Sequence, residues 1–153
     1  MEIKQTIGID ISKLTFDVRI HSNQCYRVFD NTLKGFKELI KWTDKNNPFS
    51  KENTLFVIEY TGIYSEEISL FFTKNDIHFS LIPGLEIKKS LGISRGKDDK
   101  VDATKIALYG HRLRDEIKPS KIPSIAISKI KRLLTLRERL VKQRAGHKVT
   151  LKE

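Results

Sequence analysis

The fold is decided by the stretch Thr6-Ile7-Gly8-Ile9-Asp10 and by the two segments that follow it, residues 14–20 and 24–29. Both later segments alternate apolar and polar side chains, which is typical of half-buried β-strands. Only short polar connections join the three segments. We therefore predict a meander of three antiparallel strands at the start of the chain.

Two further strands follow, each preceded by a predicted helix. Residues 54–58 are almost entirely apolar, as expected for a strand buried on both faces of a parallel sheet. A helix capped by Asn31 or Thr32 precedes this strand, and its predicted apolar face contains Leu33, Phe36, Leu39, Ile40 and Thr43. A second helix, residues 63–74, leads to a strand over 77–82. The order predicts an α/β fold whose mixed sheet has three antiparallel and two parallel strands, with helices on both faces.

After residue 83 the hydrophobic period is helical to the end of the chain. We predict helices over residues 85–91, 99–113 and 124–148, with a glycine-containing basic loop over 92–97. The domain organisation expected from this pattern is a sheet domain over residues 1–115 and a basic helical arm over 116–153, the start of a coiled-coil segment.

The charge divides the chain in the same way. The sequence carries a net charge of +10, yet residues 1–90 contain 12 basic and 12 acidic residues. Residues 118–153 contain 11 basic and 2 acidic residues. Such an asymmetry favours a polyanionic partner, most often a nucleic acid, although a solvated helix face would have the same composition.

Composition excludes several other classes of protein. The single cysteine, Cys25, excludes an intrachain disulfide framework and a cysteine-based zinc site. No apolar run approaches the roughly 20 residues of a membrane-spanning helix, and the first residues do not resemble a signal peptide. A cytoplasmic protein with no membrane partner is therefore expected.

Four carboxylates stand where a site could form. Asp10 and Glu59 each end an apolar strand, and the carboxyl ends of neighbouring parallel strands are where ligands bind in α/β sheets. Asp99 and Asp102 are three residues apart near the start of a predicted helix and share one face. Each alone is explained as a turn residue or a helix N-terminal acid. Together they would repel one another unless cations neutralised them, and oxygen ligands suit Mg²⁺ or Mn²⁺.

The same residues resemble the DEDD transposases of the insertion-sequence-110 family. Four segments match that family's motifs in order: residues 8–18 (Gly-Ile-Asp to Phe-Asp-Val), residues 59–64 (Glu-x-Thr-Gly-x-Tyr), Pro83 with Lys88, and residues 97–103. Two positions depart from the family pattern, because Ile82 replaces an asparagine and Asp98 replaces a threonine or serine. Asp98 and Asp102 are also helical neighbours, so which of Asp98 and Asp99 is the ligand stays open.

The resemblance implies an RNase H-like (RuvC-like) fold and metal-dependent cleavage and transfer of DNA strands in transposition. It implies that Asp10, Glu59, Asp99 and Asp102 are both catalytic residues and ligands of Mg²⁺ or Mn²⁺. It also implies DNA and a structured guide RNA as partners. The family carries a second domain with a serine nucleophile, so we expect this chain to be its N-terminal part and to be weakly active or inactive alone.

Basic residues in two places are expected to contact nucleic acid. The first group flanks the carboxylates and comprises Arg95, Lys97 and Lys100. The second lies on the long terminal helix and comprises Lys131, Arg132, Arg137, Arg139 and Arg144. The apolar positions of this helix, spaced by threes and fours, predict a partner helix and hence a homo-oligomer.

Alternative functions remain open from the sequence. A RuvC-type Holliday-junction resolvase would share the carboxylates, but the motifs at residues 59–64 and 97–103 count against it. A non-catalytic nucleic-acid-binding module would have the fold without the metal. A sugar-kinase half would need a second glycine-rich phosphate motif, which the sequence lacks.

Overall fold

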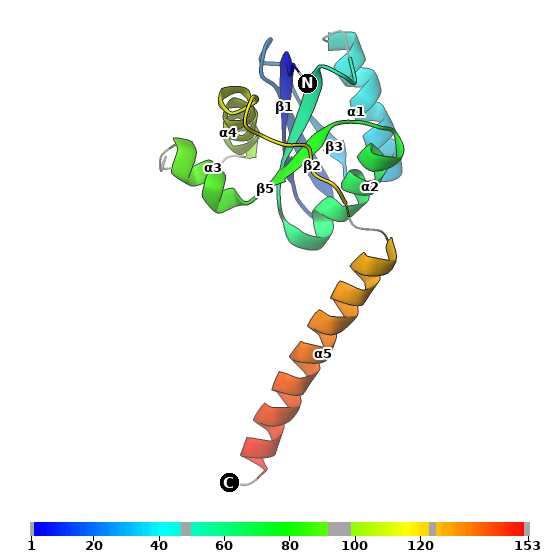
Figure 1. Cartoon of the computed structure of the whole chain (residues 1–153), viewed down its shortest axis with the longest axis vertical. Helices are drawn as coiled ribbons and strands as arrows, with labels where there is room; N and C mark the ends of the chain where they lie inside the picture. The colour runs from blue at the N-terminus through cyan, green and yellow to red at the C-terminus, as the bar shows by residue number, and fades with distance from the viewer. Residues whose placement is uncertain (1, 47–49, 92–98, 123–124, 152–153) are drawn as a thin grey trace. The chain divides into compact units, whose positions relative to one another are not determined.

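The computed structural model describes residues 2–46, 50–91, 99–122 and 125–151, and its centre is a five-stranded mixed sheet (Figure 1). The strands are β1 (Gln5–Ile11), β2 (Thr15–Ile20), β3 (Tyr26–Asp30), β4 (Thr54–Glu59) and β5 (Phe79–Ile82). They lie in the order β3-β2-β1-β4-β5. β1 pairs antiparallel with β2 and parallel with β4, and β4 pairs parallel with β5. The predicted three antiparallel and two parallel strands are confirmed.

The helices fall close to their predicted positions. They are α1 (Leu33–Asn46), the short 3₁₀ helix η1 (Gly62–Ser65), α2 (Glu66–Lys74), α3 (Gly84–Leu91), α4 (Asp99–Arg112) and α5 (Ile125–Thr150). Thr32 caps α1, because its hydroxyl accepts a hydrogen bond from the Gly35 amide at 3.3 Å. The prediction that Leu33 faces the core is wrong: Leu33 is the first residue of α1, and its side chain is 58% exposed.

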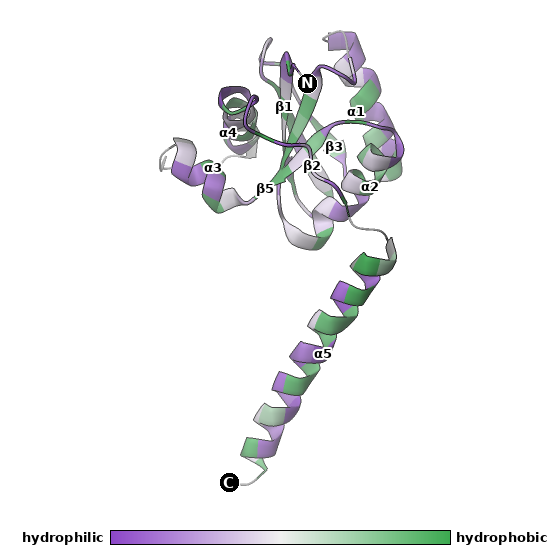
Figure 2. Cartoon of the chain, viewed as in Figure 1, coloured by the Kyte–Doolittle hydropathy of each residue, from purple (hydrophilic) through white to green (hydrophobic). Residues whose placement is uncertain are grey.

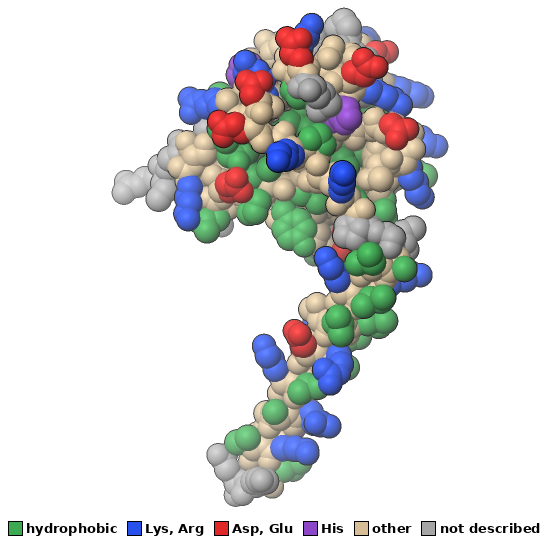
Figure 3. Space-filling view, in the orientation of Figure 1, with side chains coloured by type: hydrophobic (Ala, Val, Ile, Leu, Met, Phe, Trp, Pro, Cys, Tyr) green, Lys and Arg blue, Asp and Glu red, His purple; other side chains and the backbone are tan. Residues whose placement is uncertain are grey.

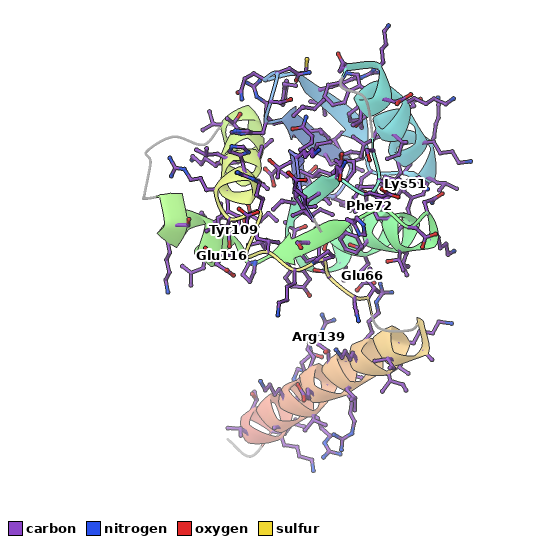
Figure 4. All side chains as sticks on the ribbon, turned by 45° about the horizontal axis from the view of Figure 1, so that its top comes forward. Lys51, Glu66, Phe72, Tyr109, Glu116 and Arg139 are labelled. Atoms are coloured by element: carbon purple, nitrogen blue, oxygen red, sulfur yellow. The ribbon has the colours of Figure 1, made fainter. Side chains whose placement is uncertain are left out.

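Aromatic side chains fill the layer between the sheet and α1 and α2. The ring centroids of Phe16 and Phe36 lie 5.8 Å apart, and those of Phe56 and Phe72 lie 4.7 Å apart. Phe72 on α2 is labelled in Figure 4. All four side chains are fully buried. Because each such side chain stabilises the fold by about 1.5–3 kcal/mol, this layer fixes the sheet against its two helices.

The opposite face of the sheet is covered by α3 and α4. Its buried core contains Ile3, Leu55, Val57, Ile82, Ile87, Ile106 and Tyr109. The Tyr109 hydroxyl on α4 donates a hydrogen bond of 2.9 Å to Glu86 Oε1 on α3, which ties these two helices together. Burial, together with the Glu86 hydrogen bond and charge, raises the pKa of Tyr109 to about 12.

The segment after α4 covers the β5 edge of the sheet. The Ser120 amide donates to the Phe79 carbonyl at 2.7 Å, and the Leu81 amide donates to the Ser120 hydroxyl at 2.9 Å. The Ser80 hydroxyl donates to the Lys118 carbonyl at 2.6 Å. Residues 118–120 therefore satisfy strand-edge groups that would otherwise be open to another chain.

The chain forms two compact units, residues 1–121 and residues 122–153. The second unit is essentially α5, whose apolar residues are strung along a single helix (Figure 2). Those with exposed side chains include Ile127, Ile130, Leu133, Leu134, Leu136, Leu140 and Val141. Among the described residues, no helix is both long and apolar enough to cross a membrane.

Candidate active site

Helix α4 packs directly on β1 at Gly8. A Cβ added to Gly8 would lie 2.3 Å from the Ala107 backbone nitrogen and 2.4 Å from the Ala103 carbonyl oxygen. Thr6, two residues earlier on β1, donates from its hydroxyl to the Ala107 carbonyl at 3.3 Å. Only glycine leaves room for this approach, which brings the helix backbone into contact with the strand.

The two elements run in opposite directions, and this places the start of α4 beside the end of β1. An added Cβ on Gly110, late in α4, would lie 3.6 Å from the Thr6 side chain, whereas Ala103 lies beside Gly8. Asp10 follows Gly8 by two residues and so projects from the same face of the sheet. The first turn of α4, which contains Asp99 and Asp102, therefore lies at the Asp10 end of β1.

Glu59 reaches the same end of the same face on the neighbouring strand. Val57 faces α4, because a Cβ on Gly110 would lie 2.5 Å from Val57 Cγ2, and Glu59 is two residues further along β4. The parallel register pairs Ile9 with Ile58, so Asp10 and Glu59 follow at matched positions on adjacent strands. The backbone thus brings Asp10, Glu59 and the start of α4 to one edge.

The described side chains are not gathered around a common point at this edge. Asp102 forms an ion pair of 3.2 Å with Lys105 on the next turn of α4. Within the described part of the chain, no three His, Cys, Asp or Glu side chains are grouped closely enough to hold a metal ion. The side chain of Asp99 lies outside the described residues, as does the whole of Asp98, so the four-carboxylate set is not seen complete.

Gly84 makes room for the Glu59 carboxylate. A Cβ added to Gly84, the first residue of α3, would lie 2.0 Å from Glu59 Oε1. The Tyr60 amide, next in the chain, donates to the Ile82 carbonyl at 2.9 Å, which holds the chain after β4 against the end of β5. Gly84 therefore determines where the Glu59 side chain can lie.

A fifth carboxylate, Asp17, lies beside Asp10 and was not assigned a role from the sequence. The antiparallel register pairs Asp10 with Asp17, so both project from one face of the sheet. Asp17 is only 8% exposed, and its carboxylate accepts a hydrogen bond from the Tyr26 hydroxyl. The cross-strand spacing around the 12–14 turn is the sequence signal that could have identified this neighbour.

The basic residues predicted to contact nucleic acid fall in different parts of the structure. Arg95 and Lys97 lie outside the described residues, and Lys100 is described only as backbone in α4. All five residues of the second group, Lys131, Arg132, Arg137, Arg139 and Arg144, belong to α5 and have exposed side chains. Figure 3 shows basic side chains along this helix, and Figure 4 labels Arg139. Arg137 and Arg144 line a shallow depression on α5 with Leu133, Leu136, Leu140 and Val141.

Two histidines that are 90 positions apart in sequence stack at the far end of α4. The His21 and His111 rings have centroids 4.0 Å apart and planes inclined by 18°. Burial of His21, with the nearby His111 and Arg114, lowers the pKa of His21. The sequence carries no signal for this contact, because nothing local indicates that the end of β2 meets the end of α4.

Comparison with known protein families shows which family this chain belongs to. Residues 7–153 match the family model of the IS110 DEDD transposases, described as "Transposase". The chain belongs to this family. The match to the IS110 family extends over nearly the whole chain, well beyond the four motifs. DNA transposition is the activity that the family implies. No curated protein matches it.

A solved structure independently supports the fold of this IS110-family domain. The structure of T. thermophilus RuvC in complex with a Holliday junction substrate matches with a TM-score of 0.50 and 10% sequence identity. The match covers 76% of this chain and 99% of that chain. At this level of identity the similarity shows the fold alone, and it confirms the predicted RuvC-like, RNase H-like architecture.

Proposed function

We propose that this chain is the metal-binding half of a DNA strand-cleaving and strand-transferring site in transposition. Asp10, Glu59, Asp99 and Asp102 are the proposed catalytic residues and ligands of Mg²⁺ or Mn²⁺. The observation that carries the proposal is the contact of α4 with β1 at Gly8, which sets the start of α4 at the edge where β1 and β4 end. Membership of a DEDD transposase family supports DNA as the substrate.

The donors fit a hard divalent cation. All four are carboxylates, and Asp10 and Glu59 are held by paired strands while Asp99 and Asp102 belong to one helical turn. When bound, such ions activate the attacking oxygen and stabilise the leaving oxygen of a phosphodiester. For Asp102 to contribute, its carboxylate must leave the ion pair with Lys105, which is a partly exposed and therefore weak pair.

We further propose that strand cleavage needs a serine-bearing domain in addition to the residues of this chain. Ser12 lies near Asp10, but its hydroxyl is engaged with the Thr15 carbonyl at 2.8 Å in the turn after β1. Ser65 and Ser69 likewise donate to backbone carbonyls within the η1–α2 segment. These hydroxyls are occupied in structural turns and helices, which suits a site whose nucleophile comes from elsewhere.

The proposed role of residues 116–153 is to contact nucleic acid and to pair with a second copy of the chain. α5 carries eight basic residues and one acidic residue, and its apolar side chains are exposed. Exposed lysine and arginine bind phosphates of DNA or of a structured guide RNA. Exposed leucines spaced by threes and fours suit a partner helix.

Cleavage of a supercoiled plasmid and of a branched DNA in Mn²⁺ tests this function. We expect the chain alone to nick slowly or not at all, and to cleave when a serine-bearing domain of the family is supplied. Asp10→Ala should abolish any cleavage, whereas Asp76→Ala should not, because Asp76 is an exposed acid before the start of β5, at the edge of the sheet opposite to Asp10.

The outcome also separates the alternatives. Rapid cleavage of the branched DNA by the chain alone, lost in Asp10→Ala, would contradict the half-site and favour a junction resolvase. No metal binding and no cleavage with the second domain present would favour a non-catalytic nucleic-acid-binding module.

A further inference from the structure

Asn31 connects the two loops that leave the carboxylate edge. It lies between β3 and α1, far along the chain from Glu59. Its side-chain Nδ2 donates one hydrogen bond to the Ser12 carbonyl and another to the Tyr64 carbonyl, each 3.1 Å long. Its backbone amide donates to the Leu14 carbonyl at 2.8 Å. One residue thus holds the loop after β1 and the 3₁₀ segment after β4.

These two loops begin shortly after the proposed ligands in the chain. Ser12 is two residues after Asp10, and Tyr64 is five residues after Glu59. The parallel pairing of β1 with β4 ends at Ile9 and Ile58, immediately before the two carboxylates. Asp10 and Glu59 are the next residues on these two strands, and each pairs with its outer neighbour, Asp10 with Asp17 and Glu59 with Ile82. The β1–β4 ladder itself does not extend to them, and the Asn31 link joins the two chain segments just after this point.

The chemistry of the link is specific to a primary amide. One NH₂ group supplies two hydrogen-bond donors, which can serve two carbonyls at once. A carboxylate of the same shape would face both carbonyl oxygens with no donor. Asn31 Oδ1 is buried and lacks a hydrogen-bond partner among the described residues, so the amide is held by the two bonds that it donates.

We propose that Asn31 is a positioning residue that sets the spacing of Asp10 and Glu59. The inference rests on the proposed metal site, and it adds to that site a residue that touches neither metal nor substrate. A cation with strict geometry should depend on this spacing more than a tolerant one. Mg²⁺ requires short, near-octahedral oxygen distances and Mn²⁺ shares its octahedral oxygen coordination, whereas Ca²⁺ accepts longer and less regular distances.

The test compares the 153-residue chain with Asn31→Leu and Asn31→Asp. Both variants lack the two donors, but only the second adds a negative charge, so an effect shared by both belongs to the lost hydrogen bonds. We expect Mn²⁺ affinity to fall about tenfold in both, as for other residues that orient metal ligands, and Ca²⁺ affinity to fall less. Asn31→Gln, which keeps the amide, should recover part of the Mn²⁺ affinity.

Asn23→Leu is the matched control. Asn23 also donates its amide to a backbone carbonyl, that of Asn46 at 2.9 Å. It lies in the β2–β3 connection beside the start of β1, since the His21 amide bonds to the Thr6 carbonyl. The control should lose two side-chain hydrogen bonds, this one and the bond that Asn23 Oδ1 accepts from the Cys25 amide at 3.0 Å, without changing the affinity for either ion.

Hydrogen exchange gives a readout that does not depend on metal. The amides of residues 12–15 and 62–65 should exchange faster together in the Asn31 variants and stay unchanged in Asn23→Leu. Unchanged exchange would overturn the link, and faster exchange with unchanged Mn²⁺ and Ca²⁺ affinities would overturn the positioning role. A wild-type chain that binds neither ion would instead refute the proposed function, and the positioning role with it, whatever the exchange shows.

Discussion

The sheet unit and α5 use their apolar residues in opposite ways. Residues 1–121 bury them on both faces of the sheet, and residues 118–120 even pair the β5 edge. α5 leaves a row of leucines and isoleucines exposed along 26 residues. The contrast indicates that the first unit closes its own core, whereas the second gains stability only from a partner. The proposed carboxylate edge therefore has a rigid support, and the basic helix does not.

The largest expected difference between the two units comes from replacing one glycine by alanine in each of them. Gly8→Ala would place Cβ within 2.4 Å of the α4 backbone and should destabilise the sheet unit by about 3 kcal/mol, as in overpacked cores. Gly146→Ala on α5 meets no atom within 4 Å and should leave the unfolding of the sheet unit unchanged. Thermal denaturation compares the two variants, and equal destabilisation would contradict the contrast.

Removing the second unit should weaken nucleic-acid binding without affecting the stability of the sheet unit. Deletion of residues 122–153 removes 9 basic and 2 acidic residues but keeps the segment that pairs with β5. We expect nucleic-acid affinity at low salt to fall at least tenfold and the salt dependence to flatten, because fewer phosphates are neutralised. The melting temperature of the sheet unit should change little, and unchanged affinity would show that α5 is not the contact surface.

Polar substitution on α5 should abolish self-association without destabilising the sheet unit. Leu133→Glu with Leu140→Glu replaces two exposed apolar side chains that lie on one face of the helix. We expect a monomer by light scattering where the wild-type chain is an oligomer, with the sheet unit equally stable. An oligomer that survives this double change would place the self-association elsewhere.

A smaller effect is expected at the bond that joins α3 to α4. Tyr109→Phe removes the hydrogen bond to Glu86 and should destabilise the sheet unit by about 1 kcal/mol. The pKa of Tyr109 is raised from 10 to about 12, so folding favours the protonated phenol. This stability is complete below pH 10 and is lost as the pH rises towards 12. Denaturation from pH 8 to 12 should show a steeper loss for wild type than for Tyr109→Phe.

The smallest effect is expected at the stacked histidines. The pKa of His21 is lowered below 6.5, so the fold favours its neutral ring. The stability from this pair is present above pH 6.5 and is lost as the pH falls through the lowered value. His21→Gln should flatten the stability profile between pH 7 and 5, and an identical profile would show that the ring does not titrate with folding.

The sequence predicted the parts of this structure that repeat locally. Alternation along residues 14–20 and 24–29, and the apolar run at 54–58, were sufficient to predict three antiparallel and two parallel strands. Leu33 was wrongly predicted to face the core, because helical periodicity does not show whether the first turn of a helix is close enough to the sheet to be buried. Periodicity describes one segment at a time and cannot predict contacts between distant segments. Two such contacts are the stacking of His21 on His111 and the pairing of residues 118–120 with β5.

The candidate site was predictable in its residue types and in its edge of the sheet, but not in its details. That Asp10 and Glu59 end neighbouring strands at one edge of the sheet followed from strand positions, whereas their common face follows from the register. The positions of Asp17, Gly84 and Asn31 follow from cross-strand pairing and from close backbone approach, for which the sequence carries no local pattern.

The central claim is that α4, held on β1 at Gly8, completes a carboxylate site for a divalent cation. Titration of the chain with Mn²⁺, followed by electron paramagnetic resonance, tests it most directly. Wild type should bind, Asp10→Ala, Glu59→Ala, Asp99→Ala and Asp102→Ala should each lose most of the binding, and Asp76→Ala should not. Equal Mn²⁺ binding by wild type and the four variants, or none by wild type, would contradict the account.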